Sequence, residues 1–392
     1  MERLLGVLVD VDSPSGDAIG IQTVADRVEA FLRSHGIVVT RPGADSTSAM
    51  LHASVGPEHG QAPLLLGHMD TVFPAGTVAH RPFHIEGERL LGPGVADMKA
   101  GLVMNSFVLA AFSRLGADAP SVRSLYTVDE EVASPSSRST IEAASLDASC
   151  VLNAEPARAN GNVVVKRKGG LFLQLTIEGQ SAHSGVNFTE GASAIEAIAH
   201  KIVAITALTD NAVGITANVG LVSGGQSVNT VAPYAEAGID IRYPVREQRE
   251  GLLAHIRAIC TATEVAGTRT TIQVTGEFLP MEPSEQSLRL FEAYRQGAAE
   301  IGFTVDGEST GGCSDAGLSA SLGVPTLCGL GPIGGNAHTT NEYVERASLV
   351  PRAQALALLV LRHGTTRLED RALLSTKPTR PKGAANQQWE PT

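Results

Sequence analysis

The chain has 392 residues, of which 43% are hydrophobic and 18% charged; this is the composition of a folded globular protein, with enough length for two or three domains. A formal net charge of −11 argues against nucleic acid as a partner, and four cysteines without paired spacing favour free thiols over a disulfide framework. Residues 1–17 do not have the pattern of a signal peptide, and no apolar run approaches the roughly 20 residues of a membrane helix, so we expect no membrane partner and a cytoplasmic protein.

The first part of the chain predicts alternating helices and strands. Apolar residues at helical spacing and a closing glycine favour a helix over 21–35, and the apolar run at 63–68 is typical of a strand buried on both faces. A helix over 98–115, a strand over 124–128, a helix over 136–145 and a strand over 150–155 follow. This order predicts an α/β fold with a mostly parallel sheet and helices on both faces.

The middle of the chain has a different order. Residues 170–179 alternate like a half-buried strand, and 191–208 have the pattern of an amphipathic helix. Strands over 213–222 and 234–243, a helix over 247–263 and a strand over 270–275 complete this part. The order β-α-β-β-α-β is typical of a ferredoxin-like α+β domain, and we expect it to be inserted in the first domain.

The alternation of the first part returns after the insertion, with helices predicted over 284–302 and 346–364. We therefore assign residues 1–166 and 277–365 to the first domain and 167–276 to the inserted domain. Residues 366–392 lose the apolar periodicity, which predicts a flexible tail.

Polar side chains follow several apolar segments where a strand is predicted to end. His68 and Asp70 follow the strand at 63–68, and their spacing of two places them on the same side of extended backbone. Similar turns carry Asp97, Glu130, Glu131, Glu155 and His338. Taken singly, a histidine of this kind is as well explained by a polar strand end, and an acidic pair by solvated surface. The ends of parallel strands meet at one edge of a sheet, so together these groups predict a site.

Two histidines and three carboxylates, with one glutamate to spare, are a suitable ligand set for two divalent ions. Mixed imidazole and carboxylate ligation suits zinc, with manganese or cobalt as substitutes. Two dications about 3.5–4 Å apart repel, so they need a shared carboxylate and a negative ligand set. In the pair Glu130 and Glu131, one glutamate can bind metal while its neighbour acts as general base.

With these segments in this order, the sequence resembles the di-zinc aminoacylase and carboxypeptidase family, which includes bacterial glutamate carboxypeptidase, acetylornithine deacetylase and succinyl-diaminopimelate desuccinylase. The resemblance covers about residues 8–365. It implies that His68 and Glu155 hold one zinc and that Glu131 and His338 hold the other. It also implies that Asp97 bridges the two zincs and is followed by a cis peptide bond. Asp70 would orient His68, and Glu130 would be the catalytic base.

The same resemblance assigns roles to the inserted domain, which would be a lid and the homodimer interface. "SAHSG" places His183 where the family has a catalytic histidine that reaches into an active site, usually the partner subunit's. "GGQSVNTVAP" places Asn229, and "GIDIRYP" places Arg242, at positions that bind the substrate's carbonyl and carboxylate. A surface loop, a turn and a solvated strand end are the alternatives for these three residues. In "TGGCSDAG", Gly312 would let the backbone approach the substrate.

One segment departs from the family. Many relatives carry an arginine and a proline where the chain re-enters the first domain, and that arginine binds substrate carboxylate. This chain has Phe278 and Leu279 there, which predicts a preference for neutral residues over glutamate or aspartate, with Phe278 offering apolar surface. The predicted activity is hydrolysis of an amide or peptide bond next to a free carboxylate, as in a carboxypeptidase or dipeptidase. The alternatives are an N-acyl-amino-acid deacylase and a catalytically silent binding relative.

Overall fold

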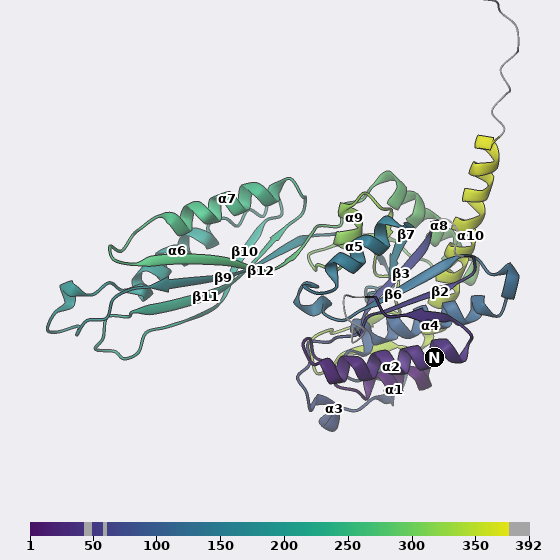
Figure 1. Ribbon diagram of the computed structural model, residues 1–392, viewed down its shortest axis with the longest axis horizontal. Coiled ribbons are helices and arrows are strands. Elements are labelled where there is room, and N and C mark those ends of the chain that lie inside the picture. Colours follow the sequence, from purple (N-terminus) through teal and green to yellow (C-terminus); the bar gives the residue numbers. More distant parts are fainter. Residues whose placement is uncertain (43–48, 58–60, 376–392) are drawn as a thin grey trace, which may run out of the picture.

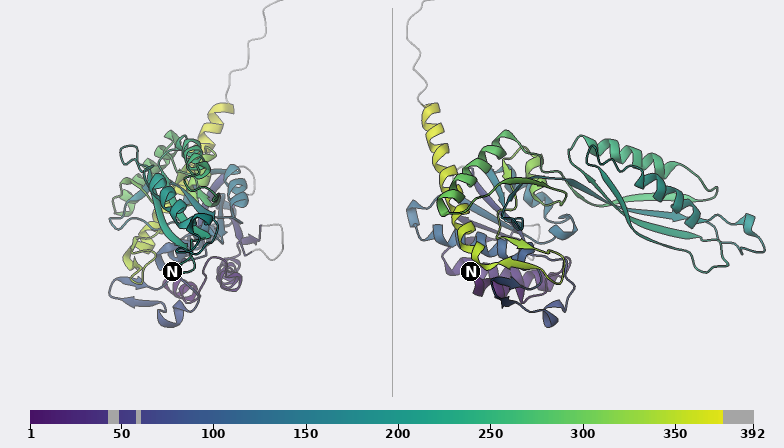
Figure 2. Two further views of the ribbon diagram at one scale, coloured as in Figure 1. Left: turned by 90° about the vertical axis from the view of Figure 1, so that its left-hand side faces the viewer. Right: turned by 180° about the vertical axis from the view of Figure 1, so that it is seen from behind.

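The computed structural model describes residues 1–42, 49–57 and 61–375, and it shows two lobes side by side along the longest axis (Figures 1 and 2). The larger lobe is built on a six-stranded sheet. Its strand order is β1 (Val38–Thr40), β2 (Leu51–Val55), β6 (Val122–Thr127), β3 (Ala62–His68), β7 (Ala148–Asn153) and β14 (Thr326–Leu327). Strands β6, β3, β7 and β14 are parallel, and β1 and β2 are antiparallel at one edge.

Helices cover both faces of this sheet, as the sequence predicts. On β3 every residue is buried, and successive side chains enter different cores because they alternate between the two faces. Leu65 packs into the large core with α1 (Glu2–Val9), α2 (Ala18–Ser34), α4 (Ala100–Ser113), α8 (Glu285–Ile301) and α10 (Leu349–Ser375). Leu64 and Leu66 pack on the other face with α5 (Arg138–Leu146) and α9 (Ala316–Ser321).

Helix α4 lies in the middle of the large core. The window Val95–Ser113, which includes it, is long and apolar enough to cross a membrane by length and composition. This corrects the expectation that no apolar run comes near that length. However, 83% of the window is buried inside the protein, where it packs as the central helix of the lobe.

The smaller lobe has the predicted ferredoxin-like architecture. Strands β9 (Gly169–Glu178), β10 (Thr216–Gly224), β11 (Tyr234–Tyr243) and β12 (Arg269–Phe278) form an antiparallel sheet in the order β10-β11-β9-β12. Helices α6 (Ala194–Thr206) and α7 (Gln248–Thr261) cover one face and bury a core of their own (Figure 1). The other face and the edge strand β10 leave apolar side chains exposed, among them Leu221 and Val222.

A four-stranded antiparallel sheet lies beside the large core and supports two loops of the site. It contains β15 (Gly334–Gly335), β16 (Tyr343–Glu345), β5 (Arg89–Leu91) and β4 (His84–Glu86), in that order. The short strands β8 (Val163–Arg167) and β13 (Gly307–Thr310) pair where the two lobes join. The remaining elements are α3 (Thr77–His80), a π-helical segment at Val95–Lys99, and 3-10 turns at Gly116–Asp118, Glu130–Val132, Phe188–Glu190 and Arg346–Ser348.

The end of the chain differs from the prediction. Helix α10 continues to Ser375, so residues 366–375 are helical, and 376–392 lie outside the described residues; the flexibility of the tail stays a prediction. The sequence after 364 has no proline until Pro378 and is rich in leucine, arginine, glutamate and alanine, which are good helix formers. Loss of an apolar stripe is therefore no sign that a helix ends.

Candidate metal centre

His68 is the last residue of β3, and its side chain is 1% exposed. Its Nδ1 lies 3.0 Å from the backbone oxygen of Asp70 and 3.3 Å from the carboxylate of Asp70. These contacts fix the orientation of the imidazole and leave Nε2 for the site. The carboxylate of Asp70 also accepts hydrogen bonds from the Ser15 hydroxyl at 2.6 Å and from the backbone N–H groups of Glu130 and Glu131, each at 3.1 Å. Asp70 thus fixes the position of both His68 and the turn Glu130–Val132, which we call the acidic turn.

Asp97 lies in an irregular turn before α4. The peptide bond between Asp97 and Met98 is cis, as expected from the family resemblance. Glu342, which is 0% exposed, accepts hydrogen bonds from the backbone N–H groups of Gly94, Ala96 and Asp97 at 3.1, 2.8 and 2.9 Å. This carboxylate holds the turn in the conformation that carries Asp97.

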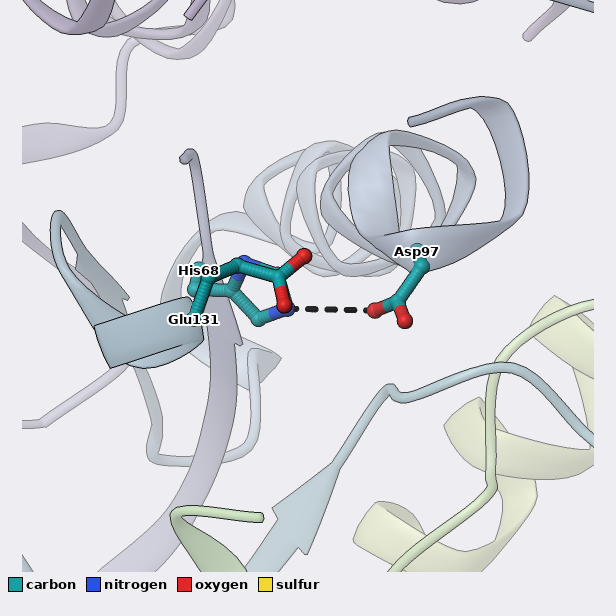
Figure 3. Close-up of side chains that lie close together, drawn as sticks. All are labelled: His68, Asp97 and Glu131. Carbon is teal, nitrogen blue, oxygen red and sulfur yellow. Dashed lines mark hydrogen bonds and ion pairs between the residues drawn. The ribbon is translucent and has the colours of Figure 1, made fainter. Parts of the chain in front are cut away.

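The two carboxylate oxygens of Asp97 face two different histidines. Its Oδ1 lies 3.3 Å from His68 Nε2, and its Oδ2 lies 3.2 Å from His338 Nε2. Glu155 Oε1 is 3.6 Å from His68 Nε2, and Glu131 Oε2 is 3.3 Å from His338 Nε2. Figure 3 shows His68 and Glu131 directed toward the space beside Asp97. The structure therefore brings together all five predicted metal ligands, in two groups that share Asp97.

Glu130 lies on the His68 side of this cluster. Its Oε2 is 3.9 Å from His68 Nε2, and ligand atoms of His68, Glu130 and Glu155 all lie within 4.8 Å of one another. The same holds for His68, Asp97 and Glu131. The distance between Glu130 Oε2 and His68 Nε2 is therefore compatible with two roles for Glu130, as a metal ligand or as a general base beside the ligands.

The electrostatics of the cluster show an excess of negative charge. Burial, with the nearby charge of Asp97, raises the pKa of Glu155 to about 8, and burial also raises the pKa values of Glu130 and Glu131. Contacts with Asp97 and Glu131 raise the pKa of His338 to about 10. Burial opposes the ionisation of Asp97, but the two histidines outweigh it and hold its pKa below the usual value. Positive charge placed among these groups would stabilise all four carboxylates.

The donor set fits two divalent cations. Among the described residues, Glu131 Oε1 and Glu155 Oε1 are buried oxygens without a hydrogen-bond donor, which is costly unless a cation takes that place. Imidazole nitrogen and carboxylate oxygen are suitable ligands for zinc, and also for manganese or cobalt.

His183 and Asn229 lie away from this cluster. They follow the ends of β9 and β10 that point away from the larger lobe, and both are exposed. The two loops that carry them are paired through the backbone. Ser184 donates its backbone N–H to the backbone oxygen of Asn229 at 3.0 Å, and His183 forms an isolated antiparallel β-bridge with Thr230. The structure of one chain therefore joins these two residues to each other and not to the metal ligands.

Arg242 lies at the opposite end of the smaller lobe, next to the larger one. Its guanidinium donates to Asp240 at 2.9 and 3.1 Å, contacts the Cys313 thiol, and lies 5.3 Å from the centre of the Phe172 ring. This end of the sheet also contacts the chain after Glu131, since Arg138 donates to the backbone oxygen of Glu277. Arg242 is therefore close to the glycine-rich loop, and strand β12 of the same sheet contacts helix α5 of the larger lobe.

The glycine-rich loop with Gly312 is held by Arg167, which is 6% exposed. Arg167 donates Nη1 to the backbone oxygens of Gly312 and Cys313 at 3.3 and 3.0 Å, and Nε to the Cys328 sulfur at 3.1 Å. Gly170 lies against this loop, and a Cβ there would lie 2.9 Å from the Cys313 sulfur, so the thiol would have to shift to accommodate a larger residue. Gly312 itself is exposed and has room for a Cβ.

Phe278 does not have the place that the sequence suggested. It is 6% exposed and packs edge to face on Phe172 with ring centres 6.1 Å apart, opposite Gly170 in the neighbouring strand. It is thus part of the packing where the lobes join, and it cannot offer apolar surface to a substrate. The pairing with Gly170 explains this, because a residue without a side chain leaves space for an aromatic ring in the next strand.

Two buried acids near the site were missed by sequence reasoning. Glu342 lies four residues after His338, and that proximity was the only available signal. Asp315 is 2% exposed, accepts a hydrogen bond from the Ser134 hydroxyl, and links the glycine-rich loop to the chain that follows Glu131. Burial raises the pKa of Asp315 to about 7.

The fold thus carries a candidate site for metal ions, and the comparison with known sequences assigns the chain to a family of hydrolases. The sequence profile described as Peptidase family M20/M25/M40 matches residues 64–362, so the chain belongs to this family, and the resemblance drawn from the motifs is confirmed. Carboxypeptidase G2 from Pseudomonas sp. (strain RS-16) is 26% identical over 368 residues, which cover 92% of this chain and 88% of that protein.

Solved structures share the fold across both lobes. The M20 family metallo-carboxypeptidase Sso-CP2 from Sulfolobus solfataricus aligns with a TM-score of 0.75 at 17% identity, over 92% of this chain and 98% of that one. The YXEP protein of Bacillus subtilis, described as a dinuclear metal binding peptidase from the M20 family, aligns with a TM-score of 0.66 at 16% identity, over 93% and 97%. The α/β fold with an inserted antiparallel domain is therefore that of M20 peptidases.

Proposed function

We propose that this protein uses two divalent metal ions to hydrolyse an amide or peptide bond next to a free carboxylate, as a carboxypeptidase or dipeptidase does. The observation that carries this proposal is the position of Asp97 between His68 and His338, at 3.3 and 3.2 Å from the two Nε2 atoms. A glutamate lies beside each histidine, which gives each ion a ligand group and a shared carboxylate.

The ligands would be His68, Glu155 and Asp97 for one ion and His338, Glu131 and Asp97 for the other. The three carboxylates carry three negative charges, which offset most of the charge of two dications. Zinc is the proposed metal, with manganese or cobalt as substitutes. Bound here, such ions would polarise the substrate carbonyl and lower the pKa of water.

Glu130 is the proposed general base, which takes a proton from the attacking water and passes it to the leaving amine. Its backbone N–H is fixed by Asp70, and its carboxylate lies close to the metal ligands without standing between the two histidines. Burial raises its pKa in the metal-free protein, and metal ions bound beside it would favour the ionised form that a general base needs.

Arg242 is the proposed partner of the substrate's free carboxylate, and the backbone near Gly312 would lie against the substrate. Arg242 is already paired with Asp240, and the nearby Arg167 uses its donors on the Gly312 loop and Cys328. Among the described residues we assign no further cation to a second substrate carboxylate, and we therefore expect neutral residues to be preferred on grounds of charge alone.

His183 and Asn229 are proposed to serve the active site of a second copy of the chain. In one chain they lie far from the metal ligands, and both are exposed next to the apolar edge of β10, where Leu221 is 75% exposed. A homodimer formed through the smaller lobe would bury this edge and bring His183 to the partner's site, where it would stabilise the oxyanion.

A hydrolysis screen of the zinc-loaded protein tests the proposal. Dipeptides and longer peptides should be cleaved at the carboxyl end, and Glu130→Gln should lower the turnover by about 10²–10⁴-fold. Cleavage of N-acyl amino acids alone would favour the deacylase. Binding of these compounds without turnover, with zinc, manganese or cobalt, would contradict the proposal and favour a silent binding relative.

A further inference from the structure

The loop that carries His338 is anchored at its C-terminal end by Glu342. The loop connects β15 and β16, and His338 lies at its exposed tip with a side chain that is 53% exposed. Within the loop, Thr339 donates its hydroxyl to the backbone oxygen of Asn336 at 2.8 Å. That hydrogen bond lies within the loop and does not connect it to the rest of the site. Glu342 makes this connection.

Glu342 joins this loop to the turn that carries Asp97. Strand β16 pairs with β5, with Tyr343 opposite Leu91, so Glu342 lies beside the chain that leaves β5. Its carboxylate there accepts three backbone N–H groups, from Gly94, Ala96 and Asp97. The two segments touch closely, since a Cβ on Gly334 would lie 2.8 Å from the Cβ of Ala96.

We propose that Glu342 is a positioning residue that sets the distance between His338 and Asp97, and thereby the affinity of the metal site formed by His338, Glu131 and Asp97. The other site shares Asp97 but depends less on Glu342, because His68 ends a fully buried strand and is held by Asp70, whereas both Asp97 and the loop of His338 contact Glu342 or follow from its position. A carboxylate suits this role, since it has acceptor positions for three N–H groups and no donor of its own. The inference rests on the proposed metal centre.

Substitution of Glu342 should therefore weaken one metal ion more than the other. In Glu342→Gln the amide keeps one acceptor oxygen and adds an NH2 group that faces backbone N–H groups. Changes in residues that orient metal ligands typically weaken metal binding by about 10–100-fold. We expect a loss of that size for one equivalent, with the other bound nearly as in the wild type.

The test is calorimetric titration of metal-free protein with zinc chloride, on wild type, Glu342→Gln and Glu342→Ala. Glu345→Gln is the matched control, because Glu345 lies three residues further along the chain, at the end of β16, and is partly exposed. The expected result is two equivalents for wild type and control, and one weakened equivalent for the Glu342 variants. Far-UV circular dichroism and the melting temperature show whether each variant is folded; if Glu342→Ala is not, Glu342→Gln decides.

His338→Ala identifies which equivalent is affected. It should weaken the same equivalent, and adding Glu342→Gln to it should cause little further loss at the remaining one. Equal weakening of both equivalents in folded Glu342→Gln, or no weakening, would overturn the inference while leaving the metal centre intact. Wild-type protein that binds fewer than two zinc ions would overturn the proposed metal centre itself.

Discussion

In the larger lobe, carboxylate oxygens from separate turns lie 3.2–3.9 Å from the histidine Nε2 atoms. At the far end of the smaller lobe, His183 and Asn229 are exposed, and the loops that carry them are hydrogen-bonded to each other. The first group is fixed by buried strands and by buried carboxylates that accept backbone N–H groups. The second group lies on loops beyond the ends of a four-stranded sheet. The candidate metal ligands thus come together within one chain, whereas our proposal assigns His183 and Asn229 to the site of a second copy.

This difference gives a test in each region. Changes in the larger lobe should affect the chain that carries them, whereas changes at the far end of the smaller lobe should affect the partner.

The largest effect is expected at the acidic pair. Glu130→Gln should keep both metals and lose about 10²–10⁴-fold in turnover, because it removes the general base and leaves the ligands in place. Glu131→Gln should instead lose metal, since its carboxylate lies 3.3 Å from His338 Nε2. Metal content by mass spectrometry, together with kcat, separates the two. Equal loss of metal in both variants would contradict the roles assigned to them.

The next effect concerns the far end of the smaller lobe. Removal of one group that stabilises an oxyanion typically costs about 10²–10³-fold in kcat, so we expect a loss of that order in His183→Ala. If His183 serves the partner, a mixture of His183→Ala and Glu130→Gln subunits should regain activity. Random exchange of equal amounts forms hybrid dimers with one intact site and restores about a quarter of wild-type activity.

Exchange itself has to be followed with labelled subunits, because a mixture of His183→Ala and wild-type subunits has the same activity whether or not they exchange. No recovery in the His183→Ala and Glu130→Gln mixture, under conditions where labelled subunits do exchange, would show that each chain completes its own site. Full activity in a monomer, measured by light scattering, would contradict the dimer altogether.

Arg242 tests the near end of the same lobe. Hydrogen bonds to charged groups contribute about 1.5–3 kcal/mol, so Arg242→Ala should lower kcat/KM by about 10–100-fold for substrates with a free carboxylate. Arg269→Ala is the matched control, since that arginine pairs with Glu178 at the far end and is exposed. A smaller loss for the amidated substrate than for the free acid would assign the contact to the carboxylate.

Because Arg242 is the one cation that we assign to the substrate, it also predicts the preference between neutral and acidic substrate side chains. A leucyl substrate should be cleaved faster than a matched glutamyl substrate in the wild type, measured as kcat/KM. Faster cleavage of the glutamyl substrate would show that another cation near the Gly312 loop is available to it.

The sequence predicted the order of helices and strands because burial on one or both faces leaves a clear periodicity, as in β3 and β9. His68, Glu131 and Glu155 could be predicted because the parallel strands β3, β6 and β7 end at one edge of the sheet. Asp97 and His338 lie instead in loops of the antiparallel sheet β15-β16-β5-β4, so the prediction from parallel strands does not explain them, and only the family resemblance gave them their roles. Glu342 and Phe278 could not be placed, since their environments depend on which residues pair across strands far apart in the sequence. Glu342 meets Asp97 through the register of β16 with β5, and Phe278 meets Gly170 through that of β12 with β9.

The smallest expected effect is a pH dependence of stability that arises at Asp315, between the larger lobe's acidic turn and the Gly312 loop. Burial raises the pKa of this carboxyl from 3.8 to about 7, because the ionised form is poorly solvated there. A group whose pKa is higher in the folded state contributes stability below its unfolded pKa, and that contribution is lost as the pH rises through the folded value. The metal-free protein should therefore lose stability at Asp315 between about pH 4 and pH 7, by an amount of order 1 kcal/mol or more.

In Asp315→Asn the amide oxygen still accepts the Ser134 hydroxyl, and no charge forms. Urea unfolding at pH 5 and pH 8 should then show a smaller decrease in the free energy of unfolding for Asp315→Asn than for the wild type. Glu300→Gln, on the exposed end of α8, is the control and should behave as the wild type does. An identical decrease in Asp315→Asn and wild type would show that Asp315 is ionised across this range, and that the Ser134 contact and the nearby histidine compensate for its burial.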